Sequence, residues 1–406
     1  KWSEMAKSAM RVLAIAASEE AVREGEGFPP LILIGLVGIK DEIRREAKEA
    51  VLSVRGAGIQ TVMITGDNAD TAAAIARECG IILPDDRAVI LTGQELAAMK
   101  DSEVKEVLND LRVVARALPT DKSRLVRIAQ EEGLVAGMTG DGINDAPALK
   151  AADVGFAMGS GTEVAKEAGD VVILDNNIAS IAKAVLYGRT IFKSIRKFII
   201  FQLTMNLCAV GVSIVGPLIG VDAPITVMQM LWVNIIMDTL GGLAFAGEAP
   251  QREYMREAPK RRDEPIVNRY MVNQIFWLAA FTLGLFLLFL KSPALQAVFR
   301  YYENPLCFMT AFFALFIFAG IFNCFNARTH RLNLLAHLGE NRGFVIIMCG
   351  IALVQLGLIY FGGGLFRTTP LMPGEVARVI LIAALVFPAD LLRKILIRAF
   401  HRQGQV

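Results

Sequence analysis

Two carboxylates and an amide lie within one ten-residue stretch, 138–147, which reads Met-Thr-Gly-Asp-Gly-Ile-Asn-Asp-Ala-Pro. The stretch follows a short apolar run, 134–137, that is typical of a buried strand, and its last residues open a predicted helix. A glycine on each side of Asp141 lets the backbone turn sharply and approach a ligand closely. Asp141 suits a hard, oxygen-liganded Mg²⁺, while Asn144 and Asp145 can hold neighbouring backbone and phosphate oxygens in register. The pattern predicts a magnesium and phosphate site where a strand of an open α/β sheet ends.

Two other element ends carry residues suited to the same chemistry. Thr65, Gly66 and Asp67 follow a predicted strand, where a hydroxyl and backbone N–H groups can bind a phosphoryl oxygen. The same triplet could instead only cap the next helix. Lys122 stands at the start of another predicted helix, so its ammonium could neutralise phosphoryl charge in a transition state. The alternative interpretation of Lys122 is an exposed surface lysine.

Short apolar runs alternate with helical patterns from residue 31 to residue 174. Such alternation predicts a Rossmann-like α/β fold, with a parallel sheet covered by helices on both faces. The predicted strands are 31–37, 59–64, 89–91, 113–115, 134–137, 154–157 and 171–174. The predicted helices are 42–55, 69–79, 94–108, 121–132 and 163–168.

The second half of the chain is much more apolar than the first. Hydrophobic residues make up 54% of the 406 residues, and from Phe198 onward they gather in long runs that predict membrane spans. The net charge of +2 is too small to indicate nucleic-acid binding. The five cysteines occur singly, which indicates neither a disulfide framework nor a soft-metal site. The six predicted spans are about 198–219, 225–246, 272–290, 307–325, 344–361 and 376–397.

Positive charge is concentrated on alternate connections between these spans. Lys and Arg gather before the first span, between the second and third, between the fourth and fifth, and after the sixth. By the positive-inside rule, both ends of the chain are expected on the cytoplasmic side.

The predicted spans contain few polar residues. Asn206 lies in the first span, and Asn234 and Asp238 lie four residues apart in the second, on one helical face. A carboxylate at membrane depth is a functional candidate by default, and two amides with one carboxylate suit a hard cation. Hydrogen bonding between helices is the competing interpretation. Asp390, near the end of the last span, is expected to pair with the basic residue three or four positions later.

Taken together, these stretches resemble P-type cation-transporting ATPases, a branch of the haloacid-dehalogenase superfamily, and most closely the plasma-membrane type of calcium pump. The resemblance rests on the stretch 138–147 and on Leu-Trp-Val-Asn-Ile-Ile-Met-Asp at 231–238, with support from 201–206 and 323–328. It implies ATP-driven Ca²⁺ export across the plasma membrane through an aspartyl phosphate, with Mg²⁺ as cofactor. The partners implied are the lipid bilayer, the transported ion and the missing N-terminal portion of the protein.

The resemblance also implies a separate role for each part of the chain. Residues 1–30 would close the nucleotide-binding domain, with Arg11 reaching the nucleotide phosphates. Residues 31–190 would form the phosphorylation domain and residues 191–403 the transmembrane domain. The residues expected to surround the phosphorylated aspartate are Thr65, Gly66, Asp67, Lys122, Asp141, Asn144 and Asp145. Those expected at the transported cation are Asn206, Asn234 and Asp238.

The chain departs from the family pattern in two ways. The family's phosphoacceptor motif, Asp-Lys-Thr-Gly-Thr, is absent from these residues, so the chain alone is expected to lack ATPase activity. Ala209, Met237 and Gly320 stand where pumps with two calcium sites carry oxygen-bearing side chains, which favours one Ca²⁺ per cycle.

Three alternatives remain open. One is a P-type pump for another cation, such as Na⁺, K⁺, H⁺ or Mn²⁺. Another is a phosphatase of the same superfamily fused to an unrelated membrane module, which would need its own Asp-x-Asp nucleophile ahead of Thr65. The last is a non-catalytic membrane protein or a truncated product.

Overall fold

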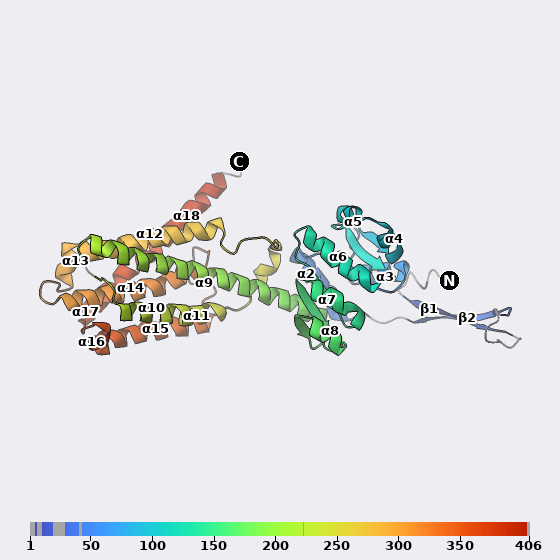
Figure 1. The fold of residues 1–406 in the computed structure, drawn as a ribbon, viewed down its shortest axis with the longest axis horizontal. Coiled ribbons are helices and arrows are strands. Elements are labelled where there is room, and N and C mark those ends of the chain that lie inside the picture. The colour runs from blue at the N-terminus through green and yellow to red at the C-terminus, as the bar shows by residue number, and fades with distance from the viewer. Residues whose placement is uncertain (1–4, 6–9, 19–28, 40–42, 222, 404–406) are drawn as a thin grey trace. The chain divides into compact units, whose positions relative to one another are not determined.

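The structure is a computed structural model that describes residue 5 and residues 10–18, 29–39, 43–221 and 223–403, except the side chains of residues 11, 236–238 and 400–403. The chain divides into two compact units, each described by itself below (Figure 1). The first, an α/β unit, contains Lys1–Gly188 and Gln251–Glu264. The second, a helical unit, contains Arg189–Pro250 and Pro265–Val406.

The segment 251–264 was predicted to belong to the membrane half, but it packs with the α/β unit. Tyr254, in the 3₁₀ helix η3 (Arg252–Arg256), is 5% exposed. Arg262 forms an ion pair with Asp153, with 3.2 Å between Nε and Oδ1. Buried aromatic area and opposite charge thus hold this segment on the α/β unit.

Parallel strands in the α/β unit form two three-stranded sheets, ordered β3-β5-β4 and β6-β7-β8. The strands are β3 (Met63–Ile64), β4 (Val89–Thr92), β5 (Leu111–Ala115), β6 (Gly137–Gly140), β7 (Val154–Met158) and β8 (Val171–Ile173). The α/β class is therefore confirmed, although the strands do not form the single sheet that the alternation predicted. The predicted strand 134–137 begins three residues late, because Leu134 is still held by the end of the preceding helix, its N–H donating to Ala129 O at 3.1 Å.

The predicted strand 31–37 does not join either parallel sheet. It forms β2 (Ile32–Ile39), which pairs antiparallel with β1 (Arg11–Ala17) from Arg11 opposite Ile39 to Ala17 opposite Ile32. Periodicity predicts that a segment is a strand, but not which strand it pairs with. The strand itself was therefore predicted correctly, whereas its place in a parallel sheet was wrong.

Helices cover both parallel sheets (Figure 1). The single predicted helix 94–108 is two helices, because Met99 and Lys100 leave the helical conformation. The helices are α2 (Arg45–Gly56), α3 (Ala69–Glu78), α4 (Gly93–Ala98), α5 (Asp101–Val107), α6 (Pro119–Glu131), the 3₁₀ turn η1 (Ile143–Asp145), α7 (Ala146–Ala151) and α8 (Glu163–Ala168).

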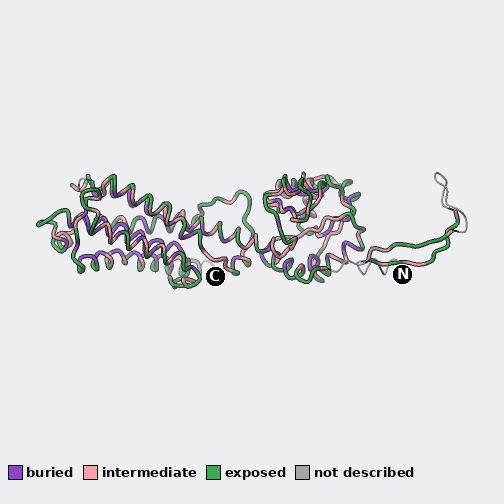
Figure 2. The backbone as a smooth tube through the Cα atoms, turned by 90° about the horizontal axis from the view of Figure 1, so that it is seen from below, coloured by how far each residue is buried: buried purple, intermediate pink, exposed green. Residues whose placement is uncertain are grey.

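Five helices among the described residues are long and apolar enough to cross a membrane, and the first of them begins in the α/β unit. They are α9 (Ile178–Leu218), the continuous run Val227–Ala246, α12 (Arg269–Lys291), α14 (Pro305–Arg328) and α15 (Arg342–Phe361). α14 is the most buried of these five helices, with 78% of its apolar window buried. Figure 2 shows the buried residues of this unit among more exposed ones. The run Val227–Ala246 contains α10 (Val227–Asn234), the π-helix η2 (Ile235–Gly241) and α11 (Gly242–Ala246). Short helices α13 (Pro293–Val298) and α16 (Gly363–Phe366) lie in the connections.

The sixth predicted span is interrupted. It consists of α17 (Pro373–Ala383) and α18 (Val386–Gln403), so it is not one continuous helix. Pro388 explains the break, because it has no N–H to donate to Ala384 and its ring clashes with that carbonyl. The Ala384 carbonyl instead accepts from Phe387 N at 3.0 Å, in a tighter turn.

Candidate active site

The carboxylate of Asp145 joins three groups at the carboxyl end of β6. Its Oδ1 accepts a hydrogen bond from Nζ of Lys122 at 2.5 Å. Its Oδ2 accepts from the backbone N–H groups of Asp141 and Gly142, both at 3.1 Å. The Asp145 side chain is only 8% exposed and that of Lys122 20%. Both oxygens of Asp145 are thus committed, one to a cation and one to the turn that carries Asp141.

These contacts decide the charge of Asp145. Burial by itself raises the pKa of the carboxyl, but the hydrogen bond from Lys122, the N–H groups of Gly142 and Asp141 and the nearby ammonium charge outweigh it. The pKa of Asp145 therefore lies below its ordinary value, and the group is a carboxylate at neutral pH. A charged pair of this kind holds Lys122 in one orientation.

The turn can form only because two glycines, one in the turn and one in the loop after β7, lack a side chain. A Cβ placed on Gly140 would lie 2.4 Å from the Cβ of Asp145. A Cβ on Gly161, in the loop after β7, would lie 2.8 Å from the carbonyl oxygen of Asp141. The same carbonyl accepts from Thr162 N at 2.8 Å, so the loops after β6 and β7 are bonded to each other.

Lys122 is placed by the first turn of α6. Pro119 occupies a position at the start of this helix, where its missing N–H costs nothing. Asp121 is 5% exposed, and its Oδ2 accepts from Leu118 N at 2.8 Å. A Cβ on Gly93 would lie 3.1 Å from the same oxygen, so α4 and α6 touch there. Asp121 and Gly93 were not among the predicted site residues, although an acidic residue in the first turn after a proline is a recognised helix-start signal.

Thr65, Gly66 and Asp67 form a separate turn at the end of β3. The Thr65 hydroxyl accepts from Asp67 N and donates to Asp67 Oδ2, both at 3.1 Å. The backbone joins this turn to the residues after β5, through Arg116 N to Asp67 O at 2.9 Å and Ala117 N to Thr65 O at 3.0 Å. Among the described residues, no hydrogen bond or ion pair joins this turn to Asp141 or Asp145. The structure therefore places both groups at carboxyl ends of parallel strands, without direct contact between them.

Asp141 and Asn144 are exposed, and within the described part of the chain their side chains have no hydrogen-bond or ion-pair partner. A free carboxylate beside a fixed lysine fits Mg²⁺, which usually binds proteins through one or two carboxylates and keeps several waters for phosphate oxygens to replace. Asp145 has no free carboxylate oxygen for a metal ion, because Lys122 and the backbone N–H groups of the turn bind both of its oxygens. The residues present thus fit a magnesium ion held by Asp141.

The other predicted site residues lie outside this cluster. Arg11 lies in β1, and its side chain lies outside the described residues. In the helical unit, Asn206 in α9 and Asn234 at the end of α10 are exposed on the described helices. Asp238 lies in η2, and its side chain also lies outside the description. Asp390 pairs as predicted, its Oδ1 accepting from Arg393 Nε at 2.8 Å and its Oδ2 lying 2.7 Å from Lys394 Nζ.

Comparison with known families also separates a hydrolase part from a transport part, although the segment 251–264 falls within the second. Residues 5–153 match a haloacid dehalogenase-like hydrolase model, and residues 130–185 match a second one. Residues 222–396 match the model for the C-terminus of cation-transporting ATPases. The hydrolase match contains Thr65, Lys122 and Asp145, and the ATPase match contains Asn234 and Asp238.

Curated relatives combine both parts in one protein. The chain is 38% identical over 401 residues to a putative plasma membrane-type calcium-transporting ATPase 13 of Arabidopsis thaliana, covering 96% of this chain and 38% of that protein. It is 40% identical over 370 residues to plasma membrane calcium-transporting ATPase 3 of Homo sapiens, covering 86% of this chain and 30% of that protein. It is 38% identical over 434 residues to calcium-transporting ATPase PAT1 of Dictyostelium discoideum, covering 97% and 39%.

The chain is a homologue of the calcium-transporting ATPases. As such a homologue, it carries a haloacid dehalogenase-like hydrolase domain and the C-terminal domain of cation-transporting ATPases, and its apolar helices belong to an integral membrane protein. The chain spans between 30% and 39% of the length of the three relatives named above.

Proposed function

We propose that this calcium-transporting ATPase homologue forms the phosphoryl-transfer and ion-binding part of an ATP-driven pump that exports Ca²⁺ across the cell membrane. The nucleophilic aspartate would come from the portion of the protein outside these residues, because Asp-Lys-Thr-Gly-Thr does not occur within them. The observation that carries the proposal is the fixed Lys122–Asp145 pair beside the free carboxylate of Asp141, at the carboxyl end of β6.

The side chains divide the work of phosphoryl transfer between them. Lys122 presents its ammonium to the phosphoryl oxygens, and Asp145 keeps that ammonium in place, so little reorganisation is needed as charge develops. Asp141 would hold Mg²⁺, which supplies a second positive charge shared by the phosphoryl oxygens when bound. Thr65 and the N–H of Gly66 would bind another phosphoryl oxygen, with Asp67 holding the Thr65 hydroxyl. The exposed amide of Asn144 would be free to bind a phosphate oxygen. Arg11 would contact the phosphates of ATP.

The helical unit would provide the ion site and the orientation. Asn206, Asn234 and Asp238 supply the oxygen atoms that a hard cation prefers, and π-helical segments such as η2 are frequent at functional sites. The exposure of Asn206 and Asn234 agrees with ligands that further parts of the complete protein would cover. Both ends of the chain would lie in the cytoplasm, on the side of ATP.

The test is labelling of the complete protein with ATP that carries radioactive γ-phosphate. Asp141→Ala is expected to abolish labelling, because clamps on transferring phosphoryl groups typically contribute several kcal/mol. Asp70→Ala, an exposed carboxylate in the first turn of α3, serves as the matched control and should label normally. Labelling of the Asp141→Ala protein at the control level would overturn the assignment. Repeating the assay with Ca²⁺, Mn²⁺, Na⁺ or K⁺ as the only activating ion tests the choice of cation.

A further inference from the structure

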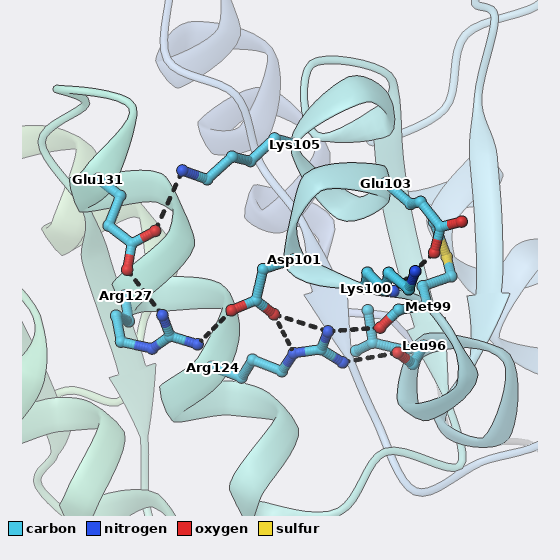
Figure 3. Close-up of polar contacts among 9 residues, drawn as sticks. All are labelled: Leu96, Met99, Lys100, Asp101, Glu103, Lys105, Arg124, Arg127 and Glu131. Atoms are coloured by element: carbon cyan, nitrogen blue, oxygen red, sulfur yellow. Dashed lines mark hydrogen bonds and ion pairs between the residues drawn. The ribbon is translucent and has the colours of Figure 1, made fainter.

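Arg124 lies on α6, two residues beyond Lys122, and its guanidinium is bonded to the connection between α4 and α5 (Figure 3). It donates to the carbonyl oxygen of Leu96 at 2.6 Å and to that of Met99 at 2.7 Å. Its Nε donates to Oδ1 of Asp101 at 2.9 Å. One side chain thus joins the end of α4 and the start of α5 to α6.

The acceptors of Arg124 are groups that need a donor. The last carbonyls of a helix lack a full set of partners within that helix, and α4 ends at Ala98, where Leu96 O also accepts a long bond from Met99 N at 3.3 Å. Asp101 begins α5, where a carboxylate is favoured by the helix dipole. Arg127 and then Arg124 hold the pKa of the Asp101 carboxyl below its ordinary value, so this acceptor is charged at neutral pH. A rigid, planar guanidinium presents five donors in a fixed fork and so spans several separated acceptors better than the compact ammonium of lysine.

Arg124 and Asp121 lie on the same face of α6, and both contact α4. Asp121 lies three residues before Arg124 and meets Gly93 in the first turn of α4, while Arg124 binds the carbonyls at the other end of α4. α6 is therefore fixed on α4 at two points, one on each side of Lys122 in the sequence. Lys122 itself projects to a different neighbour, Asp145 of η1.

The remaining ion pairs in Figure 3 are more exposed than those of Arg124. Arg127 bonds Oδ2 of Asp101 at 2.7 Å and Glu131 at 2.6 Å, with 53% of its side chain exposed. Lys105 lies 3.1 Å from Glu131. In the described contacts neither Arg127 nor Lys105 donates to a carbonyl of α4, so each is a suitable comparison for Arg124.

We propose that Arg124 is a positioning residue for phosphoryl transfer. It fixes the rotation of α6 about its own axis and the position of α6 on α4, and thereby the position of the Lys122 ammonium. The proposal rests on the function proposed above for Lys122. A displacement of a catalytic group by about 1 Å can slow a reaction by roughly a hundredfold, so a loosened α6 should slow the transfer without removing any reacting group.

A double-mutant cycle in the complete pump tests this. The rate of phosphoenzyme formation from ATP is measured for the unsubstituted protein, Arg124→Ala, Lys122→Ala and the double variant. We expect Arg124→Ala to slow formation by about tenfold or more, yet to leave the already slow Lys122→Ala protein almost unchanged, because its whole effect passes through Lys122. A residue that only stabilised the fold would slow both backgrounds by the same factor, and that result would overturn the proposal.

Further variants keep the test decisive if Arg124→Ala folds poorly. Arg124→Lys keeps the charge but not the wide, fixed fork of donors that spans both carbonyls and Asp101, so its rate should lie between those of the alanine variant and the unsubstituted protein. Arg127→Ala, which also loses a bond to Asp101, should keep at least half of the rate. Equal loss in Arg124→Ala and Arg127→Ala would refute a specific role for Arg124. If Lys122→Ala itself reacts at the normal rate, the proposed function of the site fails, and this outcome is distinct from additive effects of the two substitutions.

Discussion

The backbone of Gly140 passes so close to Asp145 that a methyl group on its Cα would lie 2.4 Å from the Cβ of Asp145 and 2.7 Å from Oδ2. The side chain of Asp145 cannot move freely, because its Oδ2 accepts from the N–H groups of Asp141 and Gly142 and its Oδ1 accepts from Lys122. This contact makes glycine the only residue that fits at the end of β6.

Gly140→Ala is therefore expected to displace the Asp145 side chain and separate it from Lys122. Overpacking of this kind costs about 1–3 kcal/mol of folding free energy, and phosphorylation of the complete protein should fall at least tenfold. Thermal unfolding and labelling by ATP measure the two effects. Gly56→Ala is the control, since no atom outside its own helix lies within 4 Å of an added Cβ there. Equal behaviour of the two variants would contradict the steric interpretation.

Asp86 should make the stability of the α/β unit depend on pH. Its carboxylate accepts from Arg55 at 2.5 and 2.7 Å and from Leu83 N at 2.9 Å, and these bonds lower the pKa of Asp86 from 3.8 to about 2. A carboxyl with a lower pKa in the folded state stabilises the fold above its unfolded pKa and loses that contribution as pH falls through the folded pKa.

Asp86→Asn should accordingly lower the melting temperature at pH 7, and the difference from the unsubstituted chain should shrink between about pH 4 and pH 2. Melting curves of the chain in detergent across this range measure it. A difference that stays constant down to pH 2 would show that the ion pair contributes nothing through its charge.

Asp238→Asn in the complete pump should weaken activation by Ca²⁺ severely, because it removes the carboxylate of the proposed ion site. The variant should still be phosphorylated by inorganic phosphate, a reverse reaction that needs an empty cation site. Asp390→Asn is the matched control within the helical unit: it loses its bonds to Arg393 and Lys394, so it should lower stability but leave calcium dependence unchanged. One Ca²⁺ per phosphoenzyme is expected, and two tightly bound ions would show that the site is misassigned.

Gln355 in α15 offers a test of stability alone. It is 0% exposed, and neither atom of its amide has a hydrogen-bond partner among the described residues. Leaving such an amide unpaired costs about 1–3 kcal/mol, so Gln355→Leu should raise the melting temperature in detergent.

Gln229→Leu provides the opposite case for comparison. Gln229 is also buried, but its amide donates to Phe366 O at 2.7 Å and accepts from Thr226 N at 3.0 Å, so its replacement should lower the melting temperature. A lower melting temperature for Gln355→Leu as well would mean that the Gln355 amide has a partner in the folded protein, such as a bound water.

The local structure around Asp141 could be predicted from the sequence because it depends on neighbours. Two glycines, a short apolar run and the polar residues after it are enough to specify a turn at a strand end. Asp390 is a similar case, since helix geometry alone brings a residue three or four positions later to its side. The break before α18 was open to prediction too, because Pro388 was visible as a residue that interrupts a helix.

Contacts between distant parts of the chain were decided only by the tertiary structure. Lys122 and Asp145 are 23 residues apart, and their pairing depends on how α6 packs against η1. The acceptors of Arg124 include backbone carbonyls 25 and 28 residues earlier, and every residue type carries a carbonyl, so the sequence holds no signal for them. The partner of β2 was missed for the same reason: the period of a strand shows which faces it has, whereas its pairing depends on which other segment satisfies its backbone groups in the folded chain.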